Sequence, residues 1–200
     1  MYDTATTSRK KGKFYDVERI ITRRRARNDY EHLIKWHGWP IDTCSWEPSI
    51  NLTSDLLRKY DFPRNITDER LQGACRALSA ASLTTIRGKT TSSFYANIEL
   101  DIWRYVMHNK GIPSAHRGHF LYEKIDFRRW KHLPAHWWYF LDANDEGQAV
   151  DFPLKAKPIL CWTPAHYFNK DKELCKAQRY PMEKICLTIS KRPCNLQNIG

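Results

Sequence analysis

The chain has 200 residues, 42% of them hydrophobic and eight of them tryptophan, which allows one or two domains with a buried core. No apolar run approaches the roughly 18 residues of a membrane-spanning helix, and residues 1–13 contain no apolar stretch typical of a signal peptide. The six cysteines are spaced too irregularly for a disulfide framework and fit a reducing compartment. We therefore expect a soluble intracellular protein rather than a secreted or membrane-spanning one.

The formal net charge is +11, and the lysines and arginines are spread along the whole chain rather than gathered in one tail. A charge of this size favours polyanions such as nucleic acid. The densest cluster is Arg23, Arg24, Arg25 and Arg27. We interpret this cluster first as the solvated end of a strand and second as a set of candidate contacts to non-specific nucleic acid.

The first third of the chain predicts a small sheet followed by a helix. Residues 1–12 are polar and basic and show no periodicity, so we expect a disordered lead-in. Apolar residues predict a strand over residues 15–25, and alternation predicts a second strand over residues 30–36. A short third strand is expected at residues 43–47. A helix capped by a hydroxyl side chain follows, and Pro63 ends it.

Three aromatic residues flank these predicted strands. Tyr15 precedes the first strand, and Trp36 and Trp39 lie at the end of the second. Together they can form a box that suits a methylated cation, because aromatic ring faces attract positive charge and methyl groups lose water readily. Each ring contributes roughly 0.5–2 kcal/mol to a cation placed over its face, so only a cluster of rings makes a site. A single tryptophan is as often a core residue.

The same stretch resembles the chromodomain family, whose motifs it follows in order and spacing: Y-x-V-E-R-I, Y-x-x-L-I-K-W-H-G-W-P, S-W-E-P, I-N-L and L-L-x-K-Y. The resemblance implies a three-stranded antiparallel sheet packed on a C-terminal helix over residues 13–63. It also implies a methyl-lysine cage made by Tyr15, Trp36 and Trp39, and an extended histone tail held between two chain segments by backbone hydrogen bonds. The groove residues carried over by position are Phe14, Asp16, Val17, Glu47, Asn51 and Thr53.

Two departures from the family's usual pattern bear on affinity. The K-K-G-K run at residues 10–13 stands where members that bind basic tails often carry acidic residues. Thr43 stands where an acidic residue often flanks the cage, with Asp42 beside it as a substitute. We therefore expect weaker affinity for a basic tail. The branch of the family stays open, because Trp39 resembles Polycomb proteins whereas Y-D-V-E-R-I resembles heterochromatin and chromodomain-Y proteins.

The middle of the chain predicts a second, helical domain. Residues 64–93 are rich in Ser, Thr, Ala and Arg. A helix over residues 70–81 is one interpretation, but Gly73 and the weak apolar face favour a linker. Over residues 94–142, apolar residues at helical spacing predict three short helices. The strings F-x7-I-x2-YV-x2-N-x3-P-S-x4-G-x2-L and W-x2-L-x3-W-x3-L resemble the Myb-like domain of the telomeric repressor-activator protein. The fold class expected for the whole chain is therefore α+β, a chromodomain followed by a mostly α three-helix domain.

In such a domain the third helix decides whether the partner is DNA or protein. Its sequence, K-H-L-P-A-H-W-W-Y-F-L-D, carries aromatic residues where a base-contacting helix would carry Arg, Lys, Asn or Gln. This composition favours a protein partner. Arg128, Arg129 and Lys131 are candidates for phosphate contacts that recognise no sequence.

Residues 143–200 match no pattern, and we assign them no fold beyond expecting a disordered tail after Ser190. The cysteines and His166 of this stretch include no C-x2-C pair, so we predict no metal site and no cofactor.

The expected function is that of a nuclear, non-enzymatic chromatin protein that binds a methylated histone tail. Non-specific nucleic acid and a protein bound by the Myb-like domain are the further expected partners, and no membrane contact is expected. The alternative is the N-terminal fragment of a chromodomain enzyme, such as a histone methyltransferase or a retroelement integrase. We favour the first hypothesis because the sequence has no dense cysteine cluster and no phosphate-binding or paired-carboxylate motif.

Overall fold

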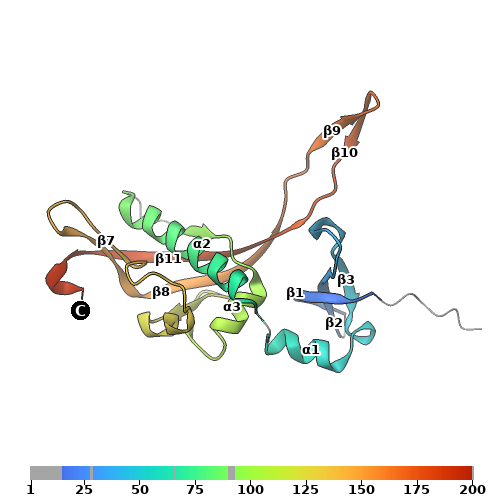
Figure 1. The fold of residues 1–200 in the computed structure, drawn as a ribbon. Helices are drawn as coiled ribbons and strands as arrows, with labels where there is room; N and C mark the ends of the chain where they lie inside the picture. The colour runs from blue at the N-terminus through green and yellow to red at the C-terminus, as the bar shows by residue number, and fades with distance from the viewer. Residues whose placement is uncertain (1–14, 28, 65, 90–92, 200) are drawn as a thin grey trace, which may run out of the picture.

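The computed structural model describes residues 15–27, 29–64, 66–89 and 93–199, which form two units joined by a short connection (Figure 1). The N-terminal unit (residues 15–62) is a small sheet closed by one helix. The C-terminal unit (residues 68–199) is a larger sheet covered by a long helix, from which a narrow arm projects on the side of the N-terminal unit (Figure 1).

The N-terminal unit has its strands and helix where the sequence pattern predicts them. The strands pair antiparallel in the order β1-β2-β3 and bury Ile20, Ile21, Leu33 and Ile34. The Thr53 hydroxyl accepts a hydrogen bond from the Leu56 N–H and so caps the helix. The elements are β1 (Val17–Ala26), β2 (Asp29–Trp36), a 3-10 turn (Ile41–Thr43), β3 (Ser45–Pro48), a second 3-10 turn (Ser49–Asn51) and α1 (Ser54–Asp61).

The C-terminal unit is built around two long strands, β8 and β11, which pair with each other along most of their length. They form the centre of a six-stranded sheet of order β4-β11-β8-β6-β5, with β7 also paired to β8. Its elements are α2 (Asp68–Arg87), β4 (Phe94–Ala96), α3 (Leu100–Val106), β5 (Ile112–Pro113), β6 (Phe120–Tyr122), a 3-10 helix (Lys124–Arg129), β7 (Tyr139–Leu141), β8 (Glu146–Trp162), β9 (Tyr167–Lys170), β10 (Glu173–Lys176), β11 (Pro181–Asn195) and a final 3-10 turn (Leu196–Asn198).

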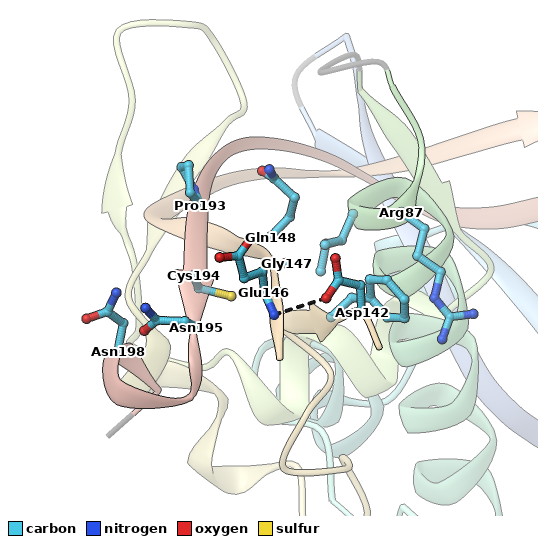
Figure 2. A pocket seen from close by; sticks show the side chains of 11 residues that line it. Arg87, Asp142, Glu146, Gly147, Gln148, Pro193, Cys194, Asn195 and Asn198 are labelled. Carbon is cyan, nitrogen blue, oxygen red and sulfur yellow. Dashed lines mark hydrogen bonds between the residues drawn. The ribbon is translucent and has the colours of Figure 1, made fainter. Parts of the chain in front are cut away.

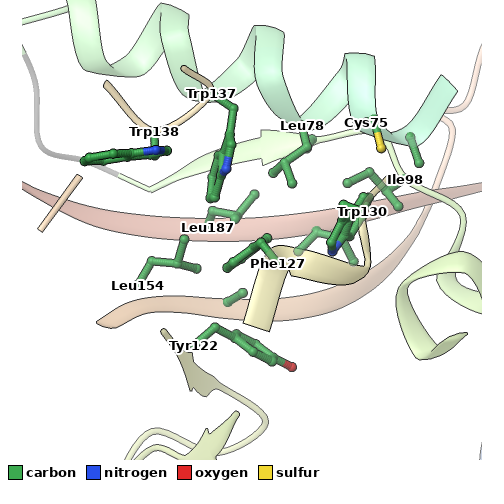
Figure 3. Packing of buried hydrophobic residues seen from close by; sticks show 14 of the residues in the cluster. Cys75, Leu78, Ile98, Tyr122, Phe127, Trp130, Trp137, Trp138, Leu154 and Leu187 are labelled. Atoms are coloured by element: carbon green, nitrogen blue, oxygen red, sulfur yellow. The ribbon is translucent and has the colours of Figure 1, made fainter. Parts of the chain in front are cut away.

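The core of the C-terminal unit lies between α2 and the sheet (Figure 3). One face of α2, which includes Cys75 and Leu78, points toward aliphatic residues of β8 and β11 such as Leu154 and Leu187. The remaining space is filled by large aromatic side chains of the segment that precedes β7, namely Tyr122, Phe127, Trp130, Trp137 and Trp138.

The Myb-like three-helix fold that the sequence predicts for residues 94–142 is wrong. Only its first helix forms, as α3. The second predicted helix is replaced by β6 and a short 3-10 helix, and the third by a loop that ends in β7. The chain as a whole is therefore strand-rich, and no DNA-recognition helix exists among the described residues of this segment.

The error has a clear physical origin. Strand β6 pairs with β8, which lies more than twenty residues away in the sequence, and this long-range pairing overrides local helical spacing. Strand β7 pairs with the start of β8 as a local hairpin. The predicted core residues Trp130 and Trp137 are nevertheless buried, at 3% and 5% exposure. Burial was predictable from the apolar pattern, whereas the secondary structure that achieves it was not.

Two further stretches differ from the sequence interpretation. The expected linker contains α2, whose buried residues belong to the core of the C-terminal unit, so Gly73 is accommodated within a helix. Residues 143–200, which showed no recognisable pattern, supply the two longest strands of the sheet. The tail expected to be disordered after Ser190 continues β11 to Asn195. Residues 1–12 lie outside the described residues.

A buried ion cluster joins the two units. Arg19 of β1 donates two hydrogen bonds, of 2.9 and 2.5 Å, to the carboxylate of Glu183 on β11. It also lies 3.4 Å from Asp101 of α3, whose carboxylate is held from the other side by Arg70. The side chains of Arg19, Asp101 and Glu183 are only 9%, 8% and 7% exposed. Burial alone would lower the pKa of Arg19, but the hydrogen bond and charge of Glu183, together with the charges of Asp101 and Glu99, raise that pKa.

A second arginine reinforces the junction. Arg104 of α3 donates to the backbone carbonyls of Ile20 and Ile21, at 2.8 and 2.9 Å, and its guanidinium lies 4.2 Å from the ring centre of Tyr60 on α1. Because no carboxylate pairs with it, burial lowers the pKa of Arg104. Charged and polar groups thus connect the two units at this junction.

His32 gives the N-terminal unit a pH-dependent stability. It is 4% exposed, its ring lies 5.7 Å from that of Tyr60, and burial, followed by the charge of Arg23, lowers its pKa below 6.5. As the pH falls, His32 is therefore protonated in the unfolded state before it is protonated in the folded state. The free energy of unfolding is at its full value above about pH 7 and decreases below about pH 6.5. We expect urea unfolding to show this loss between about pH 7.5 and 5.5. His32→Asn should reduce the dependence; an equal loss in both proteins would contradict the prediction.

None of the helices described is long and apolar enough to cross a membrane. All six cysteines are free, and within the described ranges no three His, Cys, Asp or Glu side chains are grouped as metal ligands.

Candidate functional site

Tyr15, Trp36 and Trp39 meet at one end of the N-terminal sheet. The ring centre of Tyr15 lies 6.3 Å from that of Trp36, with an interplanar angle of 67°, and 6.0 Å from that of Trp39, with an angle of 87°. The rings line an open cavity of about 460 Å³ together with Thr43 and Glu47. We call these three residues the aromatic box. Tyr15 and Trp39 are 53% and 50% exposed, so their faces are accessible to a ligand.

The local fold explains how the box forms. Val17 pairs with Trp36 across β1 and β2, which brings Tyr15 beside the indole at the end of β2. The chain then turns at Gly38, whose φ of +73° is in the left-handed region that favours glycine, and the Trp39 N–H donates to the Trp36 carbonyl at 3.3 Å. The Lys35 ammonium donates to the carbonyls of both tryptophans and pairs with Glu18 at 2.8 Å. The turn that presents Trp39 is therefore held by the backbone hydrogen bond and by the Lys35 ammonium.

A chain of hydrogen bonds links the box to the adjacent 3-10 turn. The Trp36 indole N–H donates to the Ser45 hydroxyl at 3.1 Å, and this hydroxyl donates to Glu47 Oε1 at 2.7 Å. The Asn51 amide donates to Glu47 Oε2 at 3.2 Å. Both oxygens of Glu47 thus have partners, and the carboxylate is held at the edge of the cavity.

The electrostatics of the site favour a cation with little need for hydrogen bonds. Ring faces supply negative potential, and the carboxylate of Glu47 adds a full negative charge beside them. Glu47 is the one carboxylate among the five residues that line the cavity. The ligand class that matches is a methylated ammonium, in which methyl groups replace N–H donors.

Glu47, which the sequence analysis assigned to the peptide groove, supplies the carboxylate beside the box. Thr43 lines the cavity, Asp42 is not among the residues that line it, and Glu47 supplies the acidic group. The strand period was the missed signal, because Glu47 follows Ser45 by two residues and shares its face of β3.

The candidate groove residues are brought together only in part. Glu47 and Asn51 are in contact, and Asp16 is exposed at the start of β1, where its carbonyl accepts a 2.9 Å hydrogen bond from the His37 N–H. The Thr53 hydroxyl is engaged in capping α1. Val17 is half-buried beside the box, and Phe14 lies outside the described residues.

Two of the four arginines in the run form ion pairs among the described residues. Arg23 pairs with Asp61 at 3.1 Å, and Arg24 pairs with Glu31 at 2.7 Å while lying 4.1 Å from the ring centre of Trp46. Arg25 and Arg27 are exposed. Half of the cluster therefore stabilises the N-terminal unit itself, which leaves two arginines for a phosphate contact.

Arg128, Arg129 and Lys131 are exposed and lie at or just after the 3-10 helix Lys124–Arg129. They are carried by a short turn rather than by a long helix. That these three residues contact phosphates stays a prediction. It assumed a three-helix domain, which this segment does not form.

A second cavity, of about 540 Å³, lies beside β7 in the C-terminal unit (Figure 2). Gly147 is required there, because a Cβ on it would lie 1.8 Å from the Phe140 carbonyl oxygen. The Asp142 carboxylate is used within its own turn, where it accepts hydrogen bonds from the Asn144 and Glu146 N–H groups. Arg87 lies over the Phe140 ring at 4.3 Å. Asp142 and Arg87 are thus engaged locally, and we assign this cavity no ligand.

Comparison with known proteins places the box within a known family segment. Residues 15–61 match the family model of the Chromo (chromatin organisation modifier) domain. The chain is 41% identical over 46 residues to Chromobox protein homolog hpl-1 of Caenorhabditis elegans, a match that covers 22% of this chain and 25% of that protein. It is 41% identical over 51 residues to Heterochromatin protein 1 of Drosophila melanogaster, covering 25% of each chain.

A third relative is an enzyme by name. The chain is 36% identical over 72 residues to Histone-lysine N-methyltransferase SUV39H2 of Mus musculus, covering 34% of this chain and 14% of that protein. The chain thus matches a quarter or less of the length of each of these relatives. No solved structure matches the chain.

Proposed function

We propose that this protein is a chromatin-associated reader that binds methylated lysine of a histone tail through Tyr15, Trp36 and Trp39. The observation that carries the proposal is the meeting of three aromatic rings around an open cavity with the carboxylate of Glu47 at its edge. The Chromo family match over residues 15–61 and the similarity to Heterochromatin protein 1 support the same function. A nuclear location accords with it.

The magnitude of the interaction can be bounded. Three ring faces at roughly 0.5–2 kcal/mol each supply about 1.5–6 kcal/mol, whereas a micromolar complex requires about 8 kcal/mol. The remainder has to come from the peptide backbone, which we propose pairs between the start of β1 and the stretch from Glu47 to Thr53. The lysines at residues 10–13 repel a basic tail, so we expect micromolar or weaker affinity.

Titration of the full chain with a panel of histone-tail peptides tests the proposal. For one methylation site, the trimethyl-lysine peptide should bind at least about tenfold more tightly than the unmodified peptide, because the rings act only on the desolvated cation. Trp39→Ala should remove most of this preference. Trp39 suits the test better than Trp36, whose indole N–H donates to Ser45 and is part of the hydrogen-bonded frame.

Tyr95→Ala is the matched control, since Tyr95 is an equally exposed aromatic residue, at 56%, on β4 of the other unit. It should bind like the parent. Unmodified and trimethylated peptides that bind equally across the panel would refute the proposed function.

The similarity to a methyltransferase covers 34% of this chain. It spans 72 residues and 14% of that enzyme. We propose that the shared segment contributes recognition of the histone tail and that the chain acts without catalysis of its own.

A further inference from the structure

The arm formed by residues 163–180 has no role in the site described above. It continues the β8–β11 ribbon beyond the sheet and ends in the hairpin of β9 and β10 (Figure 1). Residues 164–174 are all exposed. Among them are three large apolar side chains, Tyr167 at 57%, Phe168 at 48% and Leu174 at 75% exposure. Apolar groups that are this exposed on a projecting hairpin point to an interaction surface.

The pairing register shows what each face of the hairpin presents. Tyr167 pairs with Lys176, and Asn169 pairs with Leu174. Cross-strand partners, and residues two apart on a strand, share one face. One face therefore combines an aromatic ring, an aliphatic side chain, an amide and an ammonium without any acidic group.

The charge of the arm is positive. It carries Lys170, Lys172, Lys176 and Arg179 against only Asp171 and Glu173. None of these side chains forms an ion pair within the described part of the chain. The hairpin turns at Asp171 and Lys172, with φ values of 52° and 69°. Glycine or asparagine is usual at such a position, so Lys172 places a cation at the tip at some conformational cost.

We infer that this arm binds single-stranded nucleic acid. On its acid-free face a base can stack on Tyr167 while the Lys176 ammonium pairs with a phosphate and the Asn169 amide hydrogen-bonds a base edge. A duplex offers no free base face to an exposed aromatic ring, which favours an unpaired strand. The lysines disfavour a basic peptide such as a histone tail.

The base of the arm contacts the loop that contributes to the aromatic box. The Gln178 amide donates at 2.6 Å to the carbonyl of Asp42, whose neighbour Thr43 lines the cavity of the aromatic box. The base of the arm is thus fixed to the same loop as the box. No residue of the arm lines the cavity of the box, so this inference stands independently of the proposed function.

Fluorescence anisotropy of the full chain with labelled oligonucleotides of about 12 nucleotides tests the inference. Unstructured single strands should bind more tightly than a duplex of the same length. Tyr167→Ala should weaken single-strand binding at least about fivefold, which is the lower end of the loss for one stacked base. Lys176→Gln should reduce the slope of log affinity against log salt by about 0.7, the value for one phosphate on a single strand.

Lys89→Gln is the matched charge control, because Lys89 is exposed just after α2 and outside the arm. It should leave both affinity and salt slope unchanged. Thermal unfolding of Tyr167→Ala should match that of the parent, since the side chain is largely exposed. Equal binding of duplex and single strand would overturn the inference, and so would a Tyr167→Ala protein that binds the single strand like the parent. A third contrary result is that polyglutamate displaces the oligonucleotide and itself binds less tightly to Tyr167→Ala, which would identify an acidic polypeptide as the partner.

Discussion

Arg19→Ala should destabilise the protein by about 3–5 kcal/mol, because it removes one partner from a buried ion pair. The change leaves the carboxylate of Glu183, which is 7% exposed, with the Leu100 N–H as a hydrogen-bond donor but without its cation. Asp101 keeps Arg70, so most of the loss falls on Glu183. Urea unfolding monitored by tryptophan fluorescence measures the change in midpoint.

Arg24→Ala is the matched control on the same strand. Arg24 also pairs with a glutamate, but its side chain and that of Glu31 are 54% and 30% exposed, so its removal should cost less than about 1 kcal/mol. The double variant Arg19→Met with Glu183→Leu should recover much of the loss, since apolar residues often replace a buried pair without penalty. Equal effects of Arg19→Ala and Arg24→Ala would show that the junction contributes little.

Trp137→Ala is the second large effect, at about 3–5 kcal/mol for the loss of a buried aromatic side chain. Trp137 is 5% exposed and points into the core beside Phe127 (Figure 3), at 4.6 Å between ring centres. Its ring centre also lies 6.1 Å from that of Phe152. Its removal leaves a cavity between α2 and the sheet that rigid neighbours cannot fill. Chemical unfolding gives the change in free energy.

Trp39→Ala provides the comparison for the same substitution at a half-exposed position. It should change stability by no more than about 0.5 kcal/mol, as surface substitutions usually do. A Trp137→Ala protein as stable as Trp39→Ala would mean that the core of the C-terminal unit is not packed as described.

The N-terminal unit was predictable because its information is local. Strands β1 to β3 follow one another with short turns, and the residues that end them, such as Gly38 and Pro63, are visible in the sequence. The meeting of Tyr15 with Trp36 follows from the pairing of neighbouring strands. The family resemblance covers this same stretch.

The C-terminal unit was not predictable in the same way. Its sheet depends on pairing of β11 with β4, which are separated by more than eighty residues, and no periodicity in either strand specifies the other. Aromatic residues spaced for a helix, such as Trp130 and Trp137, are instead held by contacts with distant elements. Residues 143–200 form the centre of the sheet. They showed no sequence pattern because strands that are buried on parts of both faces do not alternate regularly between apolar and polar residues.

The junction was also invisible in the sequence. Arg19 and Glu183 are 164 positions apart, and neither is distinguished from other charged residues by its neighbours. Their pairing fixes β1, the strand that follows Tyr15, against the C-terminal unit. The box and the arm therefore belong to one connected structure.

Two peptides that differ only in charge give the most direct measurement of the proposed cage. One carries trimethyl-lysine and the other its uncharged carbon isostere, in which a tert-butyl group has the same shape. The full chain should bind the charged peptide at least about tenfold more tightly, since three ring faces contribute at least about 1.5 kcal/mol to the cation alone. Trp39→Ala should reduce the ratio of the two affinities. Equal affinity of the full chain for the two peptides would contradict recognition of methylated lysine by Tyr15, Trp36 and Trp39.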